Sequence, residues 1–346
     1  MKKLPIYIAA AAIALTVAAL VVFGKKKPLY DVYVVGEEFD AENASAAMLW
    51  KNGEPLMRLS ELGVKAGANS VFVSGFDVFV AGFEQTEEGT NIAMLWKNGQ
   101  GSALSDQARD GCANSVFVEG ENVYVAGHVN DEKGISIATL WVNNEAFSLS
   151  NGRFPASANS VFAHGDDVYV AGSENRGKAT EAAMLWTNGK GRMLNDENSP
   201  HASARSVFVS GVDVYVAGSE KDKYGQGMAT VWLNGEAVSL SADDSDAGAY
   251  NIFVSGPNVY VVGFEAPVGQ ASQIQEGALW VNGYAQPYNV EQPPAYFYSV
   301  FVWGRDVFVA GREGNIAMIW KNGKPLYRTD KDGIASFNSV FVQTIR

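Results

Sequence analysis

Carboxylates recur at one position of an internal repeat and are the first candidates for chemistry. Glutamate stands two residues after a glycine at the end of six similar segments, and Val129 takes its place in a seventh. The glutamates are Glu38, Glu84, Glu174, Glu220, Glu265 and Glu313. They could form an acidic ring that attracts a cation or a basic partner. If two of them stood about 5–9.5 Å apart, they could also act as general acid and base on a glycosidic bond. Solvated or locally paired side chains, copied when the repeat was duplicated, are the simpler interpretation.

A second set of side chains departs from the repeat. The residue just before each predicted first strand is asparagine in four units, which suits turn chemistry. In three consecutive units it is a large side chain instead. The seven residues are Asn69, Asn114, Asn159, Arg205, Tyr250, Tyr298 and Asn338. A change at a shared structural position indicates specialisation, and we expect these residues near the mouth of a central channel.

Aromatic residues gather in the same part of the chain. They are Tyr284, Tyr288, Tyr296, Phe297 and Tyr298, and Pro293-Pro294 stiffens their connection. Exposed aromatic rings beside carboxylates suit sugars, peptides or cationic groups, whereas buried ones would fill a gap in the core. The candidate ligand-binding residues are therefore Arg205, Tyr250, Tyr296, Tyr298, Glu265 and Glu313.

Other common sites have no clear signature in the sequence. The histidines, His128, His164 and His201, are scattered, and no nucleophile–base pattern or phosphate-binding glycine loop is visible. Acidic segments at 243–248 and 330–333 lack the spaced ligands and final glutamate of an EF-hand. We expect no catalytic residue, no metal and no cofactor.

Four short strands per repeat must position the candidate residues. In the unit from Asn69 to Gly99, VFVSG and DVFVAG alternate as strands do, and Gly75 provides the turn between them. AMLW is a third strand, and Asn98-Gly99 favours a tight hairpin into a fourth.

Seven such units follow one another. Their third-strand tryptophans, expected to pack between units, are separated by 46, 45, 45, 46, 48 and 40 residues and are Trp50, Trp96, Trp141, Trp186, Trp232, Trp280 and Trp320. This period predicts an all-β, seven-bladed β-propeller of four-stranded blades over residues 28–346. The first unit lacks a first strand and the chain ends with one, so we expect the C-terminal strand to complete the N-terminal blade and close the ring.

The repeat also carries a family resemblance. The pattern S-V-F-V-x-G-x-D-V-Y-V-A-G, followed by A-x-L-W-x-N-G, resembles repeats of uncharacterised bacterial seven-bladed propeller proteins over about residues 30 to 346. It lacks the Trp-Asp ending of WD40 repeats and the paired glycines of kelch repeats. The resemblance implies the fold and no particular activity.

The longer connections are expected on one face, called here the loop face. They are the second-to-third loops and the connections between blades, and function concentrates in such loops. The distance from second-strand glycine to third-strand tryptophan is 14 residues in five blades, 17 in blade 6 and 9 in blade 7. We therefore expect a partner on the loop face near blades 5 to 7.

The N-terminal segment predicts a membrane anchor. Residues 4–24 carry no charge and are long enough to span a bilayer as a helix, and lysines flank them. The expectation is a single-pass protein of the bacterial inner membrane, anchored by residues 1–27, with the propeller facing the periplasm or exterior. The alternative is a signal peptide, cleaved to give a secreted protein.

Charge narrows the choice of partner. The chain has a net charge of −12, and its first 27 residues hold five lysines and no acid, so the propeller is near −17. A propeller with this charge repels phosphate backbones, which disfavours binding of nucleic acid. The sequence favours a membrane-anchored, non-enzymatic propeller that binds a protein, peptide or glycan. The alternative is a glycosidase or lyase with paired carboxylates at the channel mouth.

Overall fold

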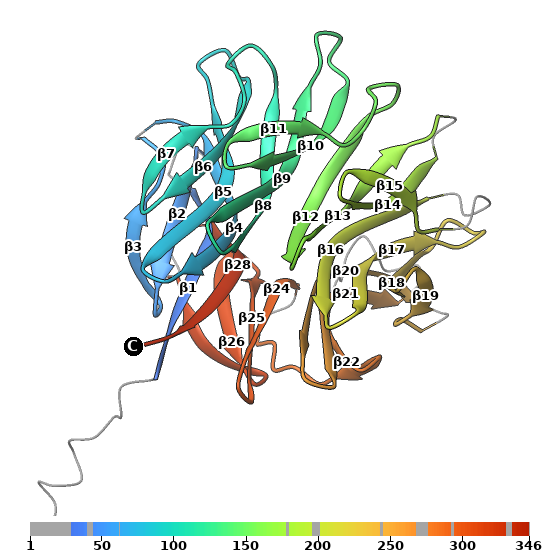
Figure 1. The fold of residues 1–346 in the computed structure, drawn as a ribbon. Helices are drawn as coiled ribbons and strands as arrows, with labels where there is room; N and C mark the ends of the chain where they lie inside the picture. Colours follow the sequence, from blue (N-terminus) through green and yellow to red (C-terminus); the bar gives the residue numbers. More distant parts are fainter. Residues whose placement is uncertain are drawn as a thin grey trace, which may run out of the picture.

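The computed structural model describes residues 29–39, 44–61, 63–177, 180–195, 201–242, 245–267, 276–291, 294–329 and 334–345. Its strands form seven antiparallel sheets of four strands, arranged around a central axis as the predicted β-propeller (Figure 1). The seven-bladed, four-stranded architecture is confirmed.

From inner to outer edge, blade 1 has β28 (Ile334–Thr344), β1 (Tyr30–Phe39), β2 (Ser45–Lys51) and β3 (Glu54–Arg58). Blade 2 has β4 (Ala66–Ser74), β5 (Asp77–Gln85), β6 (Asn91–Lys97) and β7 (Gln100–Ala103). Blade 3 has β8 (Gly111–Glu119), β9 (Asn122–Asn130), β10 (Ser136–Val142) and β11 (Glu145–Ser148). Blade 4 has β12 (Ala156–His164), β13 (Asp167–Asn175), β14 (Glu181–Thr187) and β15 (Lys190–Met193). Blade 5 has β16 (Ala202–Ser210), β17 (Asp213–Lys221), β18 (Gly227–Leu233) and β19 (Glu236–Ser239). Blade 6 has β20 (Ser245–Ser255), β21 (Asn258–Pro267), β22 (Glu276–Val281) and β23 (Tyr284–Gln286). Blade 7 has β24 (Ala295–Trp303), β25 (Asp306–Glu313), β26 (Ile316–Lys321) and β27 (Lys324–Arg328).

The third-to-fourth hairpins form as the sequence predicts. Asn98 and Gly99 have φ values of 52° and 82°, the left-handed conformation that a type I′ turn requires. The Asn98 side chain accepts a hydrogen bond from the Val78 amide and donates one to Asp77, both at 2.8 Å. The turn is thereby tied to the start of the second strand.

The inner strands begin earlier than the sequence suggests, which corrects the placement of several candidate residues. β4 starts at Ala66 rather than Ser70, and its register shifts between Ala68 and Ser70. Asn69 is thus the extra residue of a β-bulge, inside the strand and not before it. The seven bulge residues are Asn338, Asn69, Asn114, Asn159, Arg205, Tyr250 and Tyr298.

The hydrophobic core lies between blades. All seven third-strand tryptophans are buried, with at most 2% of their surface exposed. Trp96, for example, belongs to blade 2 and packs with Val35 and Leu49 of blade 1. These contacts confirm that the tryptophans serve inter-blade packing.

Two circular series join consecutive inner strands around the axis. In the first, a backbone N–H of each inner strand donates to a serine hydroxyl, or to Asn251, of the preceding blade, at 2.9–3.3 Å. In the second, seven phenyl rings lie with neighbouring centroids 4.5–4.9 Å apart, and we call it the phenylalanine belt. Its members are Phe72, Phe117, Phe162, Phe208, Phe253, Phe301 and Phe341.

The C-terminal strand β28 pairs with β1 in antiparallel register, from Tyr30 opposite Thr344 to Phe39 opposite Ile334. Figure 1 shows this red strand beside the blue strands of the N-terminal part. β28 supplies Ser339 and Val340 to the hydrogen-bond series and Phe341 to the belt. Blade 1 therefore takes one strand from the end of the chain and three from its beginning.

The predicted membrane anchor, residues 1–27, lies outside the described residues. Within the described ranges, no helix has the length and apolar character needed to cross a membrane.

Candidate functional site

Three bulge residues on consecutive blades meet near the axis. Arg205 of β16 lies over the ring of Tyr250 in β20, 5.2 Å from its centroid, and Tyr250 lies 5.9 Å from Tyr298 in β24. Because bulge residues come early in strands that run away from the loop face, they lie between that face and the phenylalanine belt. The three residues that the sequence places at one position of the repeat thus contact one another in the structure.

The other bulge residues have a structural task. Each of the four asparagines donates from Nδ2 to a carbonyl of the next blade, at 2.9–3.0 Å. Asn159, for instance, bonds the Ala204 carbonyl directly before Arg205. Arginine and tyrosine therefore replace this link on blades 5 to 7, and they add large side chains to the channel mouth.

Blade 7 adds two more residues to the contact. Tyr296 lies opposite Arg312 in the β24–β25 register, and the Arg312 guanidinium sits 4.5 Å from the Tyr296 ring centroid. The ring centroids of Tyr296 and Tyr298 lie 6.2 Å apart with an angle of 12° between the rings, and the Arg312 charge favours the ionised form of Tyr298. We call Arg205, Tyr250, Tyr296, Tyr298 and Arg312 the Arg–Tyr cluster.

Sequence reasoning missed Arg312, although a signal existed. The residue after each second-strand glycine faces the position two before the bulge, and this pair varies from blade to blade more than its surroundings. The pairs are Glu37/Ser336, Phe83/Gly67, His128/Cys112, Ser173/Ser157, Ser219/Ser203, Phe264/Gly248 and Arg312/Tyr296. Comparing the repeats in this register would have identified the mouth of the channel.

The electrostatics of the cluster favour a ligand with acceptor groups. Neither Arg205 nor Arg312 forms an ion pair within the part of the chain that the structure describes. Burial raises the pKa of Tyr250 and of Tyr298, and the neighbouring arginines oppose this only in part. Both tyrosines are therefore protonated at neutral pH, and their hydroxyls can donate hydrogen bonds.

The two glutamates proposed with these residues are placed differently. The Glu265 carboxylate accepts hydrogen bonds from the Ser245 hydroxyl at 2.7 Å and the Ala242 amide at 3.1 Å. It faces Glu276 across the β21–β22 pair, and both line a cavity of about 410 Å³ on blade 6. Glu313 is only 5% exposed. Neither glutamate has a described contact with the Arg–Tyr cluster.

The aromatic run divides between core and site. Tyr288 and Phe297 pack together with Trp320 in the core. These two aromatic residues therefore fill a gap in the core, as the second interpretation of the run predicts. Tyr284 lies exposed on the outer strand β23. Only Tyr296 and Tyr298 join the cluster, and Pro293 lies outside the described residues.

Cys112 and His128 face each other in the β8–β9 pair, at the register that Tyr296 and Arg312 occupy in blade 7. Burial raises the Cys112 pKa to about 12, and burial lowers the pKa of His128. At neutral pH the thiol is protonated and the imidazole is neutral, so this pair does not supply a thiolate nucleophile.

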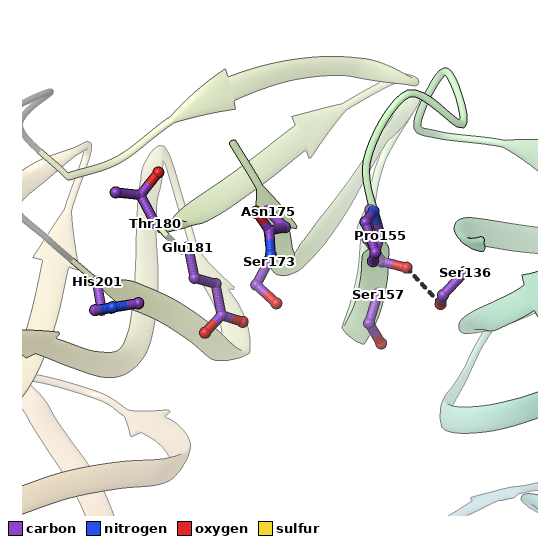
Figure 2. Close-up of a pocket in the computed structure, with 9 residues that line it drawn as sticks. Ser136, Pro155, Ser157, Ser173, Asn175, Thr180, Glu181 and His201 are labelled. Atoms are coloured by element: carbon purple, nitrogen blue, oxygen red, sulfur yellow. Dashed lines mark hydrogen bonds between the residues drawn. The ribbon is translucent and has the colours of Figure 1, made fainter. Parts of the chain in front are cut away.

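A cavity of about 480 Å³ opens beside the mouth on blades 3 to 5. Its lining residues include Ser157 and Ser173, and Figure 2 shows Glu181 and His201 on one side and Ser136 on the other. The Ser136 hydroxyl donates to the Ala156 carbonyl at 2.9 Å. The cavity reaches His201, four residues before Arg205, and is large enough for a small ligand.

Within the described ranges, no group of three or more His, Cys, Asp or Glu side chains is placed to hold a metal ion. Asp243, Asp244 and residues 330–333 of the two acidic segments lie outside those ranges.

Comparison with known proteins adds information on the fold. No family model and no curated protein matches the chain. Among solved structures, it is similar to the β-propeller domain of the Trilobed protease from Pyrococcus furiosus (15% identity over 87% of this chain and 95% of that chain, TM-score 0.51). It is also similar to the periplasmic gluconolactonase of Pseudomonas aeruginosa (12%, 91% and 100%, TM-score 0.51). A puromycin-hydrolyzing peptidase of Mycobacterium tuberculosis matches over 52% of its length (11% identity, 86% of this chain, TM-score 0.54). At these identities the likeness establishes the β-propeller fold alone.

Proposed function

We propose that this protein is a non-enzymatic binding propeller, and that the Arg–Tyr cluster holds a protein, peptide or glycan partner at the loop-face end of the channel. The observation that carries the proposal is the break in the repeat. Where four blades use asparagine to join their neighbours, three adjacent blades present aromatic and guanidinium groups in mutual contact. Tyrosine and arginine are enriched among the residues that dominate binding energy.

Single alanine substitutions test this proposal. Changing Arg205, Tyr250, Tyr296 or Arg312 to alanine should each weaken binding of a ligand, identified by pull-down or glycan array, by about 30-fold, as expected for a loss of about 2 kcal/mol. Tyr284→Ala is the matched control, since Tyr284 is an exposed tyrosine on the outer strand β23 of blade 6, outside the cluster. Wild-type affinity in all four variants, with loss of binding on changing loops of blades 2 to 4, would place the site elsewhere.

An enzyme is the second candidate function, and one observation favours it. Glu265 and Glu276 lie opposite each other in the β21–β22 pair and both line the cavity on blade 6, and glycosidase or lyase chemistry uses a pair of carboxylates. Against it, Glu265 is held by Ser245 and Ala242, and the pair lies in the blade-6 cavity, not in the Arg–Tyr cluster. Release of new reducing ends from a bound glycan would favour the enzyme.

We further propose that residues 1–27 anchor the propeller in a bacterial inner membrane, with the propeller in the periplasm or outside the cell. The charge-free run of residues 4–24 supports this proposal. The intact protein should remain with the membrane fraction through washes in high salt and in carbonate. Recovery of a soluble form beginning near Lys25 would instead show that the segment is a cleaved signal peptide.

A further inference from the structure

We infer that the Arg–Tyr cluster recognises a carboxylate on the terminal sugar of a saccharide, that is, a uronate residue at a chain end. This inference rests on the proposed binding function and specifies its ligand. Arginine charge, aromatic and hydroxyl groups, and the shape of the channel support it.

The arginines indicate the charge of the ligand. The Nε atom of Arg312 is buried and has no hydrogen-bond partner among the described residues. Leaving a buried donor unsatisfied costs about 1–3 kcal/mol, so a movement of the guanidinium that brings this donor to an acceptor on the ligand is favoured. A carboxylate matches the planar guanidinium with two parallel hydrogen bonds. It carries one charge, which meets less repulsion than a phosphate dianion from a propeller near −17.

Arg205 supplies a second guanidinium on the other side of the tyrosines. It is exposed and stacks on Tyr250, which in turn contacts Tyr298. The two arginines thus bracket three tyrosine rings, and each leaves donors for a ligand.

The remaining surface of the mouth matches a sugar better than a peptide. Tyrosine presents a flat apolar face with a hydroxyl at its tip, which suits a ring that is apolar on its faces and polar around its edge. Beside the cluster, blades 5 and 4 carry the serine pairs Ser203/Ser219 and Ser157/Ser173 in the register of Tyr296/Arg312. Serine hydroxyls both donate and accept, as sugar hydroxyls require.

The phenylalanine belt restricts the ligand to a chain end. Neighbouring ring centroids of the belt lie 4.5–4.9 Å apart, which is a spacing typical of aromatic contacts. Seven centroids at this spacing form a regular heptagon whose corners lie about 5.5 Å from the axis. Rings placed side by side at this spacing would bring carbons closer than their contact distance of about 3.5–4.0 Å. Neighbouring rings are tilted to one another by 37–58°, so each ring turns an edge toward the axis, and the belt leaves too little room for a sugar to pass.

The test uses the full-length protein and simple glycosides. Methyl glucuronide and methyl galacturonide should bind at least tenfold more tightly than methyl glucoside and methyl galactoside in calorimetric titration. Binding of the uronides should weaken as sodium chloride is raised from 50 to 500 mM, because screening reduces the attraction between charges. R312Q and R205Q should each lower uronide affinity at least tenfold and leave the neutral sugars unchanged.

Control variants and a second ligand class complete the experiment. R312K keeps the charge but not the planar donor pair, so it should recover only part of the preference for uronides. Y284A should behave as wild type toward both classes of glycoside, because Tyr284 is exposed on the outer strand β23 and does not belong to the cluster. An acetylated peptide with a free C-terminal carboxylate should bind more weakly than the uronides and should resemble its C-terminal amide.

Three outcomes would overturn the inference: equal binding of uronides and neutral sugars, preferential binding of the peptide carboxylate, or a uronide preference that survives in both R205Q and R312Q. Neutral glycans that bind wild type, but not the alanine variants of the cluster, would overturn the carboxylate while leaving the proposed function intact. Absence of any ligand whose binding depends on the cluster would overturn both.

Discussion

Deletion of residues 337–346 is expected to abolish cooperative folding of the entire propeller, although it removes only ten residues. The deletion takes most of β28 away from β1 and leaves an unpaired inner edge in blade 1. It removes Phe337, which is 1% exposed and whose ring centroid lies 4.9 Å from that of Trp50. It also interrupts the phenylalanine belt, because Phe341 is lost.

The size of the effect follows from burial. Phe337, Val340, Phe341 and Val342 pack against core residues, and burying such a side chain contributes about 1.5–3 kcal/mol. Their combined loss is comparable with the total stability of an ordinary domain, about 5–15 kcal/mol. The hydrogen bonds from β28 to blades 2 and 7 are lost as well.

Circular dichroism during heating and limited proteolysis would measure this loss. A chain that ends at Thr344 is the matched control, because it keeps all of β28. An unchanged melting temperature in the longer deletion would contradict the expected role of β28.

The elements that could be predicted from sequence are those specified locally. The Asn-Gly hairpins follow from two adjacent residues that accept positive φ, and the Val-Phe/Tyr-Val strands follow from alternation. The seven bulges could not be predicted this way. Residues such as Ala66, Gly67 and Ala68 are small and lack strand character, and they are strand only because the second strand pairs with them.

The candidate site was partly predictable for a related reason. Arg205, Tyr250 and Tyr298 are visible because they interrupt a series of asparagines, so the repeat itself supplies the comparison. Arg312 is inconspicuous beside Glu313, although successive strand residues point to opposite faces and only the arginine reaches the cluster. The role of Glu265 depends on Ser245 and Ala242, twenty or more residues away, which no local pattern reveals.

Substitution of Gly172 by alanine is expected to lower the free energy of unfolding by about 3 kcal/mol, at the upper end of overpacking effects. Gly172 lies in β13, and a Cβ atom there would overlap the Ser157 carbonyl oxygen of the neighbouring inner strand. The same overlap with an inner-strand carbonyl occurs at the equivalent glycine of every blade, Gly36, Gly82, Gly127, Gly172, Gly218, Gly263 and Gly311. Glycine is therefore required where the bulge brings the two backbones together.

Gly165→Ala provides the comparison for this substitution. Gly165 has a φ of 64°, and a Cβ there would meet no atom within 4 Å, so its cost is limited to the left-handed backbone, about 1–2 kcal/mol. Chemical denaturation of the two variants under identical conditions separates the clash from the backbone strain. If Gly172→Ala costs no more than Gly165→Ala, the close approach of the Ser157 carbonyl does not explain why all seven blades carry glycine at this position.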